Sequence, residues 1–342
     1  MENQKYETVA VVIPCRNEKK YIGLCLDSLV HCNYDKTKLE VYVCDGLSDD
    51  GTAEIVKTYA AKHPFIFLLE NKARTTPHAL NLGIRSSKTD VVIILGAHAA
   101  IAPDFVTRNL DVLNTHPDVG CAGGIIDNKY EDAVSETIGM AMSSVFGVGN
   151  AHFRTGTKSG YVDTVAFGAY TREVFEKCGL FDDELVRNQD DEFNFRISKN
   201  GFKIFLDPAI RSDYYVRGNY RKLYRQYYQY GYWKVFVNRK HHVVTSARQL
   251  MPPVFVAGLF LGWLPVFIFP WWLWVWLCGI VFYKMAALTF ALQMKPPVTK
   301  IPALMWSFFI LHFSYGLGYL EGLFNFMLLR RNPRNSGSKL SR

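Results

Sequence analysis

Polar side chains gather in two short segments, each of which follows an apolar, β-branched run. The first segment holds Pro14, Arg16, Asn17 and Glu18, and the second holds Asp45 and Asp50. A carboxylate directly after a buried strand can accept a hydrogen bond from a base N–H, as Asp45 could from uracil N3, and polar groups of the first segment can hold a ribose. Each segment alone is also typical of an Asx-rich turn. Their occurrence in this order, one strand apart, favours a nucleotide-binding site.

The elements that must position these residues alternate along the chain. Apolar runs at 9–13, 39–43, 65–69 and 91–95 predict buried strands, and helical spacing over 19–31, 53–62 and 77–86 predicts the helices between them. Such alternation with short loops favours a parallel α/β sheet of the nucleotide-binding type. Because ligands of these sheets bind beyond the carboxyl ends of the strands, chemistry is expected in the loops that begin at Pro14, Cys44 and Gly96.

At these residues the chain resembles the inverting family 2 glycosyltransferases, whose catalytic domain has the Rossmann-like GT-A fold and binds a nucleotide-sugar. The resemblance covers about residues 7–235 and is strongest to the bacterial exopolysaccharide group that includes the succinoglycan glucosyltransferases. The segment NKARTTPHALNLGIR is similar to the family's stretch between the nucleotide loop and the metal loop, with Ala79 and Asn81 on its pattern. The resemblance places Arg74 at the diphosphate, although a solvated charge beside a helix is the alternative.

The resemblance also implies a divalent metal ion, Mn²⁺ or Mg²⁺, bound by an Asp-x-Asp motif after the fourth strand. This chain reads ILGAHAAI there, so Gly96 stands at the first Asp and His98 at the last position. Imidazole suits Mn²⁺ better than Mg²⁺, which prefers oxygen ligands. His98 is therefore expected to be the metal ligand and to contact the nucleotide-sugar; the alternatives are a plain polar loop residue and a crippled site.

A second matching segment, RNQDDEFNFRI, implies the catalytic base. The family has a Glu-Asp pair followed by an Arg six residues after the Asp, so Arg196 sets the register, Asp190 is the base and Gln189 replaces the Glu. Inversion needs a carboxylate that takes the proton of the acceptor hydroxyl during in-line attack. Asp191 and Glu192 are adjacent and are alternatively surface charges at a helix start. The resemblance places Asp191, together with Gly168 and Ala169 of the similar segment FGAYTREVFEKCGLFDDEL, on the acceptor side.

The composition changes sharply near residue 217. Apolar runs at 252–269, 271–292 and 301–329 predict membrane helices, because a span takes about 20 apolar residues. The net charge of +8 is concentrated in the flanks of these runs, in 217–248 and 330–342, which favours a membrane protein over a nucleic-acid-binding one. Basic residues on both sides require an even number of crossings, so one of the three runs is expected to lie in the interface or to re-enter.

The predicted organisation is therefore a GT-A catalytic domain at 1–216, an amphipathic interfacial segment at 217–250, a membrane region at 251–329 and a basic tail at 330–342. In membrane-bound relatives a Gln/Arg-rich segment ending near Trp closes over the diphosphate, and Arg225, Gln226 and Trp233 loosely match it; the alternative is a purely interfacial helix. Seven cysteines without a C-x-x-C pair, and no cationic leader at the N-terminus, favour a cytosolic catalytic domain on an integral protein of the inner or plasma membrane.

Together these features predict an inverting transfer from a nucleoside-diphosphate sugar, a UDP-hexose, to a membrane-bound, polyprenyl-diphosphate-linked glycan in exopolysaccharide or cell-surface polysaccharide synthesis. Three alternatives remain. An inactive relative acting as a nucleotide-binding or scaffold protein is favoured by Gly96 and Gln189. A processive polysaccharide synthase needs more membrane helices than the three runs supply, and a nucleotidyltransferase needs a Gly-rich first loop that VVIPCRNE does not match.

Overall fold

The computed structural model describes residues 5–149, 152–156, 158–216, 218–244 and 247–331. It divides the chain into two compact units, Met1–Asn128 with Ala151–Tyr215, and Lys129–Asn150 with Val216–Arg342. The division at 215/216 lies beside the boundary expected at 216. Residues 129–150, which lie inside the predicted catalytic domain at 1–216, belong to the second unit of the structure. Most of the basic tail, 332–342, lies outside the described residues.

The first unit is built on an α/β sheet, as predicted, but the sheet is mixed and not wholly parallel. Its described strands are β1 (Val9–Cys15), β2 (Leu39–Asp45), β3 (Ile66–Glu70), β4 (Val91–Ile94), β5 (Ala99–Ile101), β6 (Val119–Lys129), β7 (Gly160–Tyr161), β8 (Ala166–Thr171) and β9 (Lys203–Tyr215). The order is β3-β2-β1-β4-β8-β6-β9-β5, with β7 paired to β9. The first four strands run parallel, and β8 joins β4 antiparallel. The predicted α/β class, with a parallel core over the first four strands, is confirmed.

Both faces of the parallel part are covered, which explains why its strands read as continuous apolar runs. Side chains alternate along a strand, so Val9 and Val11 of β1 enter one core while Ala10 and Val12 enter the other. The first core packs under α1 (Ile22–Val30), α2 (Thr52–Lys62) and α4 (Phe105–Thr115), and the second under α3 (Thr76–Ser86), α8 (Arg172–Cys178) and α9 (Gln189–Lys199). A Cβ on Gly83 of α3 would lie 2.4 Å from Val12 Cγ1, so only glycine permits this closeness.

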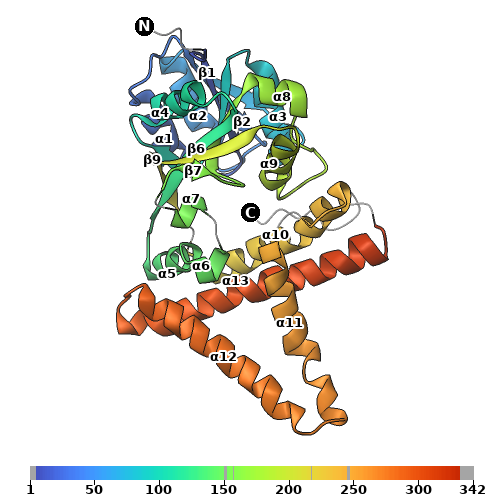
Figure 1. Ribbon diagram of the computed structural model, residues 1–342. Helices are drawn as coiled ribbons and strands as arrows, with labels where there is room; N and C mark the ends of the chain where they lie inside the picture. The colour runs from blue at the N-terminus through green and yellow to red at the C-terminus, as the bar shows by residue number, and fades with distance from the viewer. Residues whose placement is uncertain (1–4, 150–151, 157, 217, 245–246, 332–342) are drawn as a thin grey trace. The chain divides into compact units, whose positions relative to one another are not determined.

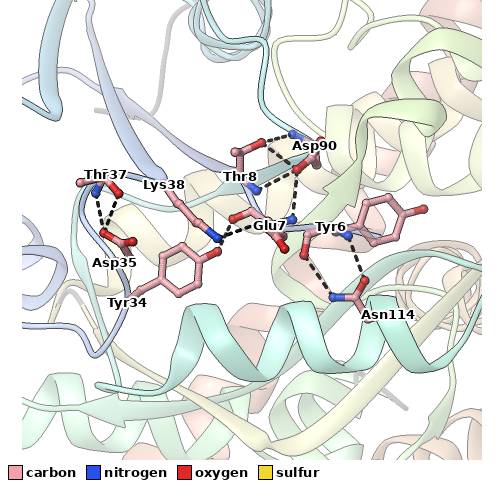
Figure 2. A network of polar contacts seen from close by, with 9 residues as sticks. All are labelled: Tyr6, Glu7, Thr8, Tyr34, Asp35, Thr37, Lys38, Asp90 and Asn114. Carbon is pink, nitrogen blue, oxygen red and sulfur yellow. Dashed lines mark hydrogen bonds and ion pairs between the residues drawn. The ribbon is translucent and has the colours of Figure 1, made fainter. Parts of the chain in front are cut away.

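A polar network fixes the amino-terminal end of the parallel strands (Figure 2). The Asp90 carboxylate accepts hydrogen bonds from Glu7 N (3.0 Å), Thr8 N (2.8 Å) and Thr8 Oγ1 (2.8 Å), while Asp90 N donates back to Thr8 Oγ1. Asn114 of α4 bonds both the N–H and the carbonyl of Tyr6. The network therefore secures the entry into β1 at the edge opposite the loops that were expected to carry chemistry.

Replacing Asp90 with alanine is expected to destabilise the chain by about 1–2 kcal/mol at pH 7, because three donors lose a charged acceptor at a partly exposed site. Burial raises the pKa of Asp90, but hydrogen bonds from Thr8 and Glu7 outweigh it and leave the pKa below its usual value. The folded-state pKa is lowered, so this contribution is present above the unfolded pKa of about 3.9 and is lost as pH falls through the folded value.

The measurement is the unfolding midpoint of the full chain in detergent, at pH 7 and at the lowest pH that the protein tolerates. Asp111→Ala, an exposed carboxylate on α4, is the matched control and should change the midpoint little at either pH. An Asp90→Ala deficit of the same size at both pH values would contradict the role of the ionised form.

The second unit is helical within its described residues. Its longer helices are α5 (Ala133–Met142), α10 (Tyr220–His241), α11 (Met251–Leu261), α12 (Trp272–Gln293) and α13 (Ile301–Gly322), and its short ones are α6 (Val145–Val148), η1 (Ala247–Leu250), η2 (Leu264–Phe267), η3 (Val298–Lys300) and the π-helical η4 (Leu323–Leu328). Helix α10 runs beside α13 (Figure 1). A Cβ on Gly318 would lie 2.0 Å from Tyr228 O, so glycine lets the two backbones touch, as small residues do between membrane helices.

Within the described residues, two segments are long and apolar enough to span a membrane, Trp272–Gln293 and Val298–Leu328. The first predicted run, 252–269, folds as α11 and η2 within the shorter apolar stretch Met251–Phe267, with Pro265 inside η2. Two of the three predicted apolar runs thus coincide with candidate spans, and the expected even number of crossings stays a prediction. The segment 217–250, expected to be interfacial, contains α10, whose residues 231–237 are buried.

The stretch 129–150 packs into the helical unit through α5 and α6. Phe146 stacks on Phe290 and contacts the rings of Phe308 and His312. The carbonyl of Phe146 lies 2.7 Å from His312 Nε2, and Glu136 of α5 pairs with Lys300 at the start of α13. These contacts explain why the stretch, which shows no strong periodicity in sequence, belongs with the apolar helices.

Candidate active site

Three loops meet at the carboxyl edge of the parallel strands. Cys15 of β1 pairs in register with Asp45 of β2, and Val12 pairs with Ile94 of β4. Gly46 N donates to the carbonyl of Cys15. The segments that follow β1, β2 and β4 therefore begin side by side, as the order of the strands predicted.

The first two loops brace each other through four hydrogen bonds. Asn17 N donates to Ser48 Oγ (2.8 Å), and Asn17 Oδ1 accepts from Asp49 N (3.1 Å). Glu18 N donates to Thr52 Oγ1 (2.9 Å), and Lys19 N donates to Asp50 Oδ2 (3.1 Å). Asn17 has φ 53°, the left-handed region that asparagine tolerates. The two loops thus form one fixed platform, consistent with their prediction as a joint site.

Asp45 is oriented by its own loop. It is 5% exposed, and its carboxylate accepts from Ser48 N (3.0 Å) and from the Ser48 hydroxyl. An ionised carboxylate has about four lone-pair positions, so these bonds leave acceptor capacity for a base N–H. The Asp50 carboxylate instead accepts hydrogen bonds from Thr52 and from Lys19 N, and so holds the platform together. Burial raises the pKa of Asp50, but these hydrogen bonds outweigh burial and leave the pKa below its usual value.

The residues predicted around the diphosphate occupy two kinds of place. Arg74 is exposed in a left-handed turn (φ 60°) just before α3, where its side chain is accessible to a ligand. Arg16 packs its aliphatic stem against Gly46. By contrast, Ala79 is buried in the core, and the Asn81 amide bonds the backbone N–H and carbonyl of Phe181. The structure gives Ala79 and Asn81 packing roles, and their expected contact with the nucleotide-sugar stays a prediction.

His98 lies beside a buried carboxylate at the loop after β4. Its Nδ1 is 3.6 Å from Glu18 Oε1, and the side chains are 18% and 1% exposed, respectively. The His98 ring meets Tyr214 edge-on at 5.0 Å, and its carbonyl accepts from Tyr215 N. Glu18 also lies near Cys25: burial, and then the charge of Glu18, raise the pKa of Cys25 to about 12.

The space at position 96 is occupied by an aromatic ring. A Cβ on Gly96 would lie 3.2 Å from Phe167 Cε1 and 3.8 Å from His98 Cε1. No group of three or more His, Cys, Asp or Glu side chains that could hold a metal ion occurs in the described part of the chain. An imidazole nitrogen beside a carboxylate oxygen is nevertheless a donor pair that fits Mn²⁺, provided that further ligands come from a substrate.

Helix α9 carries the expected base. It begins after Asn188, which has φ 61°, and Asp190 is exposed in its first turn. Arg196 does not face a ligand: its guanidinium bonds both Glu192 oxygens (2.8 Å each) and the carbonyls of Cys178 and Leu180. The reading of Glu192 as a surface charge is therefore wrong, since its side chain is buried against Arg196. These hydrogen bonds of Arg196 to Glu192, Cys178 and Leu180, here called the Arg196 clamp, hold the end of α8 to α9. They fix the helix that carries Asp190.

The remaining predicted residues lie inside packed elements or in the second unit. Ala169 of β8 is buried in register with Ile93 and Ala122, and a Cβ on Gly168 would lie 2.9 Å from Cys121 Sγ. Asp191 is half-buried beside Asp190. In α10, Arg225 is exposed, Gln226 Nε2 donates to Tyr230 Oη, and Trp233 is buried against Phe236 and Phe326. An acceptor or diphosphate role for these residues stays a prediction.

Sequence reasoning missed Tyr214, Phe167 and Arg154. Tyr214 contacts two groups: its ring meets the His98 ring edge-on, and the Arg154 guanidinium lies 5.4 Å from its ring centroid. Arg154 also bonds Asn128 Oδ1. These residues come from β8, β9 and α7 (His152–Thr155), far along the chain from the loops. Phe167 is the first residue of the matching segment FGAYTREVFEKCGLFDDEL but was given no role, and no local pattern marks Tyr214 or Arg154.

Comparison with known proteins places this geometry in a family. Residues 10–179 match glycosyl transferase family 2. The dolichyl N-acetyl-alpha-D-glucosaminyl phosphate 3-beta-D-2,3-diacetamido-2,3-dideoxy-beta-D-glucuronosyltransferase of Methanococcus voltae is 34% identical over 239 residues, which are 68% of this chain and 74% of that protein. The succinoglycan biosynthesis protein ExoA of Rhizobium meliloti (strain 1021) is 27% identical over 247 residues, covering 71% and 73%.

A solved structure shares the fold over almost the whole chain. It is the mannosyltransferase PcManGT from Pyrobaculum calidifontis in complex with GDP-Man and Mn²⁺, with a TM-score of 0.60, 20% identity, and coverage of 94% of this chain and 89% of that one. The likeness confirms the architecture, and the family match and the 34% identical relative decide the assignment. The chain belongs to glycosyl transferase family 2.

Proposed function

We propose that this protein transfers a sugar, with inversion at the anomeric carbon, from a nucleoside-diphosphate sugar to a membrane-bound, polyprenyl-diphosphate-linked glycan. The observation that carries the proposal is the braced platform at the carboxyl edge of β1 and β2, in which Ser48 orients the buried Asp45 carboxylate. That carboxylate suits the N3–H of uracil, so the donor we propose is a UDP-hexose. Support for a lipid-linked acceptor comes from the Methanococcus voltae relative, whose name specifies a dolichyl-phosphate-linked acceptor.

The proposed reaction is a single in-line displacement. The acceptor hydroxyl oxygen attacks the anomeric carbon of the donor sugar. The bond between that carbon and the diphosphate oxygen breaks, and the hydroxyl proton passes to the Asp190 carboxylate. Asp45 holds the uracil base of the donor, and Arg74 offsets the negative charge on the departing diphosphate. A divalent ion, Mn²⁺ or Mg²⁺, held in part by His98, would supply further positive charge to that leaving group.

The test is a donor screen with the full-length protein in detergent. UDP release is measured from UDP-hexoses, with GDP-mannose as the contrasting donor, in the presence of polyprenyl-phosphate- and polyprenyl-diphosphate-linked glycans. Acceptor-dependent UDP release with a product of inverted configuration is the expected result. A folded protein that binds UDP but turns over no donor would favour the alternative of an inactive relative. The glycine at position 96, in place of the first Asp of the metal motif, would then explain the lack of activity.

We also propose that the catalytic unit faces the cytosol from the inner or plasma membrane, since the basic segments on both sides of the apolar region, 217–248 and 330–342, prefer that side. Lys57→Cys, on the exposed face of α2, should resist an impermeant thiol reagent in intact cells and react after lysis. Ser48 is unsuitable for this purpose because its hydroxyl orients Asp45. Labelling of Lys57→Cys in intact cells, at the rate seen in lysate, would reverse the proposed orientation.

A further inference from the structure

We propose that Glu18 and His98 together form the cation site of this protein, and that the site is completed only by the diphosphate of the bound donor. The inference rests on the proposed function, because the diphosphate supplies the missing ligands. It assigns Glu18, which the sequence placed in the nucleotide loop, to the metal. The carboxylate that the family offers at position 96 is thereby supplied from another loop.

The first step concerns position 96, where a glycine stands in place of the first Asp of the metal motif. Gly96 has no side chain, and a Cβ built on it would lie 3.2 Å from Phe167 Cε1 and 3.8 Å from His98 Cε1. A side chain at position 96 would therefore begin next to the His98 ring. Phe167 narrows that space, and φ 49° at Phe167 shows that its backbone adopts an uncommon conformation there.

The second step is the arrival of a carboxylate from the loop after β1. Glu18 Oε1 lies 3.6 Å from His98 Nδ1, and the Glu18 side chain is 1% exposed. Thr52 fixes the backbone of Glu18, and the Cys25 thiol of α1, the helix that follows the β1 loop, lies 3.8 Å from the carbonyl of Gly96. Adjacent ligands of an octahedral ion with bonds of about 2.1 Å lie about 3.0 Å apart, so the two atoms need to approach by only roughly 0.6 Å.

The third step concerns the number of donors. Two protein ligands leave about four positions of an octahedral ion to be filled, and phosphate oxygens and water are the natural donors. No larger His, Cys, Asp or Glu group that could hold a metal ion occurs in the described residues. The cation should thus bind weakly to the protein alone and strongly once the nucleotide is present. Because one ligand is an imidazole nitrogen, Mn²⁺ is favoured over Mg²⁺.

The experiment measures this coupling by binding and does not depend on turnover. Mn²⁺ is titrated into the full-length protein in detergent, with and without saturating UDP, and free Mn²⁺ is followed by electron paramagnetic resonance against a UDP-only control. UDP affinity is measured by calorimetry in Mn²⁺ and in excess chelator. Linkage requires the two enhancements to be equal, and we expect each to be at least tenfold, within the usual range of about 5–150-fold.

Two variants then test the assigned ligands. Glu18→Gln and His98→Ala should each reduce the Mn²⁺ enhancement of UDP affinity to roughly threefold or less, an effect well below the usual coupling range. The enhancement is a ratio, so any change in UDP affinity common to both conditions cancels. The matched controls are Glu176→Gln on α8 and His31→Ala at the end of α1, both exposed and expected to keep the wild-type ratio.

The outcomes separate the inference from the proposed function. UDP binding without any Mn²⁺ enhancement, or tight Mn²⁺ binding without UDP, overturns the inference and leaves the nucleotide site intact. Wild-type coupling in His98→Ala overturns it as well, and this variant decides the matter if Glu18→Gln does not fold. A folded wild-type protein that binds neither UDP nor GDP refutes the proposed function itself.

Discussion

Replacing Asp190 with asparagine is expected to lower turnover roughly 10²–10⁴-fold, the usual contribution of a general base, while UDP binding changes little. The amide has nearly the same shape as the carboxylate but cannot accept the proton of the acceptor hydroxyl. Asp190 is exposed in the first turn of α9, and the clamp of Arg196 on Glu192 and on the carbonyl of Leu180 fixes that helix independently of Asp190. The variant should therefore fold normally, and the defect should appear in the rate.

The matched control for this experiment is Asp183→Asn, which changes an exposed carboxylate in the loop before α9. It should keep near-normal turnover. Initial rates at saturating donor and acceptor, together with UDP affinity by calorimetry, separate a chemical defect from a binding defect. Near-normal turnover of Asp190→Asn would show that another group accepts the proton, and Asp191 would be the next to examine.

Replacing Asp45 with alanine is expected to weaken UDP binding by about 1.5–3 kcal/mol, the range for losing a hydrogen bond to a charged group. Asp45 is 5% exposed and is oriented by two hydrogen bonds from Ser48, so little reorganisation precedes binding. Ser48→Ala removes one of these two bonds and also the bond that Ser48 Oγ accepts from Asn17 N. It should weaken UDP binding by about 0.5–1.5 kcal/mol, the net value of an ordinary hydrogen bond to Asp45.

Calorimetry with UDP and with UMP measures both effects, and GDP provides the test of base specificity. Asp45→Asn keeps an acceptor oxygen and should lie between the wild type and alanine, which guards against a misfolded alanine variant. If UDP binds all three Asp45 forms equally well, the carboxylate does not contact the base.

Local sequence predicted the parallel core well because each of its signals is carried by neighbouring residues. Val9–Cys15 and Leu39–Asp45 are buried on both faces, so their apolar runs identify them as strands without knowledge of their partners. Once the strands are parallel, their carboxyl ends share one edge, and the position of Asp45 and of the loop after Cys15 follows from geometry. The apolar helices of the second unit are equally easy to recognise in the sequence, since the apolar length that makes a segment a candidate span is a property of local composition.

The tertiary structure decided what depends on residues far apart in the chain. The Asn81 side chain donates a hydrogen bond to the carbonyl of Phe181, 100 residues away, and the sequence of the helix around Asn81 does not predict that partner. Glu18 meets His98 only because the sheet places β1 beside β4, and residues 129–150 join the helical unit through the contacts of Phe146 with α12 and α13. The sequence by itself determined the strands, their common edge and the apolar segments, because periodicity and composition are local. The fold decided which partners the polar side chains contact and to which unit residues 129–150 belong, since those contacts form only when distant segments are brought together.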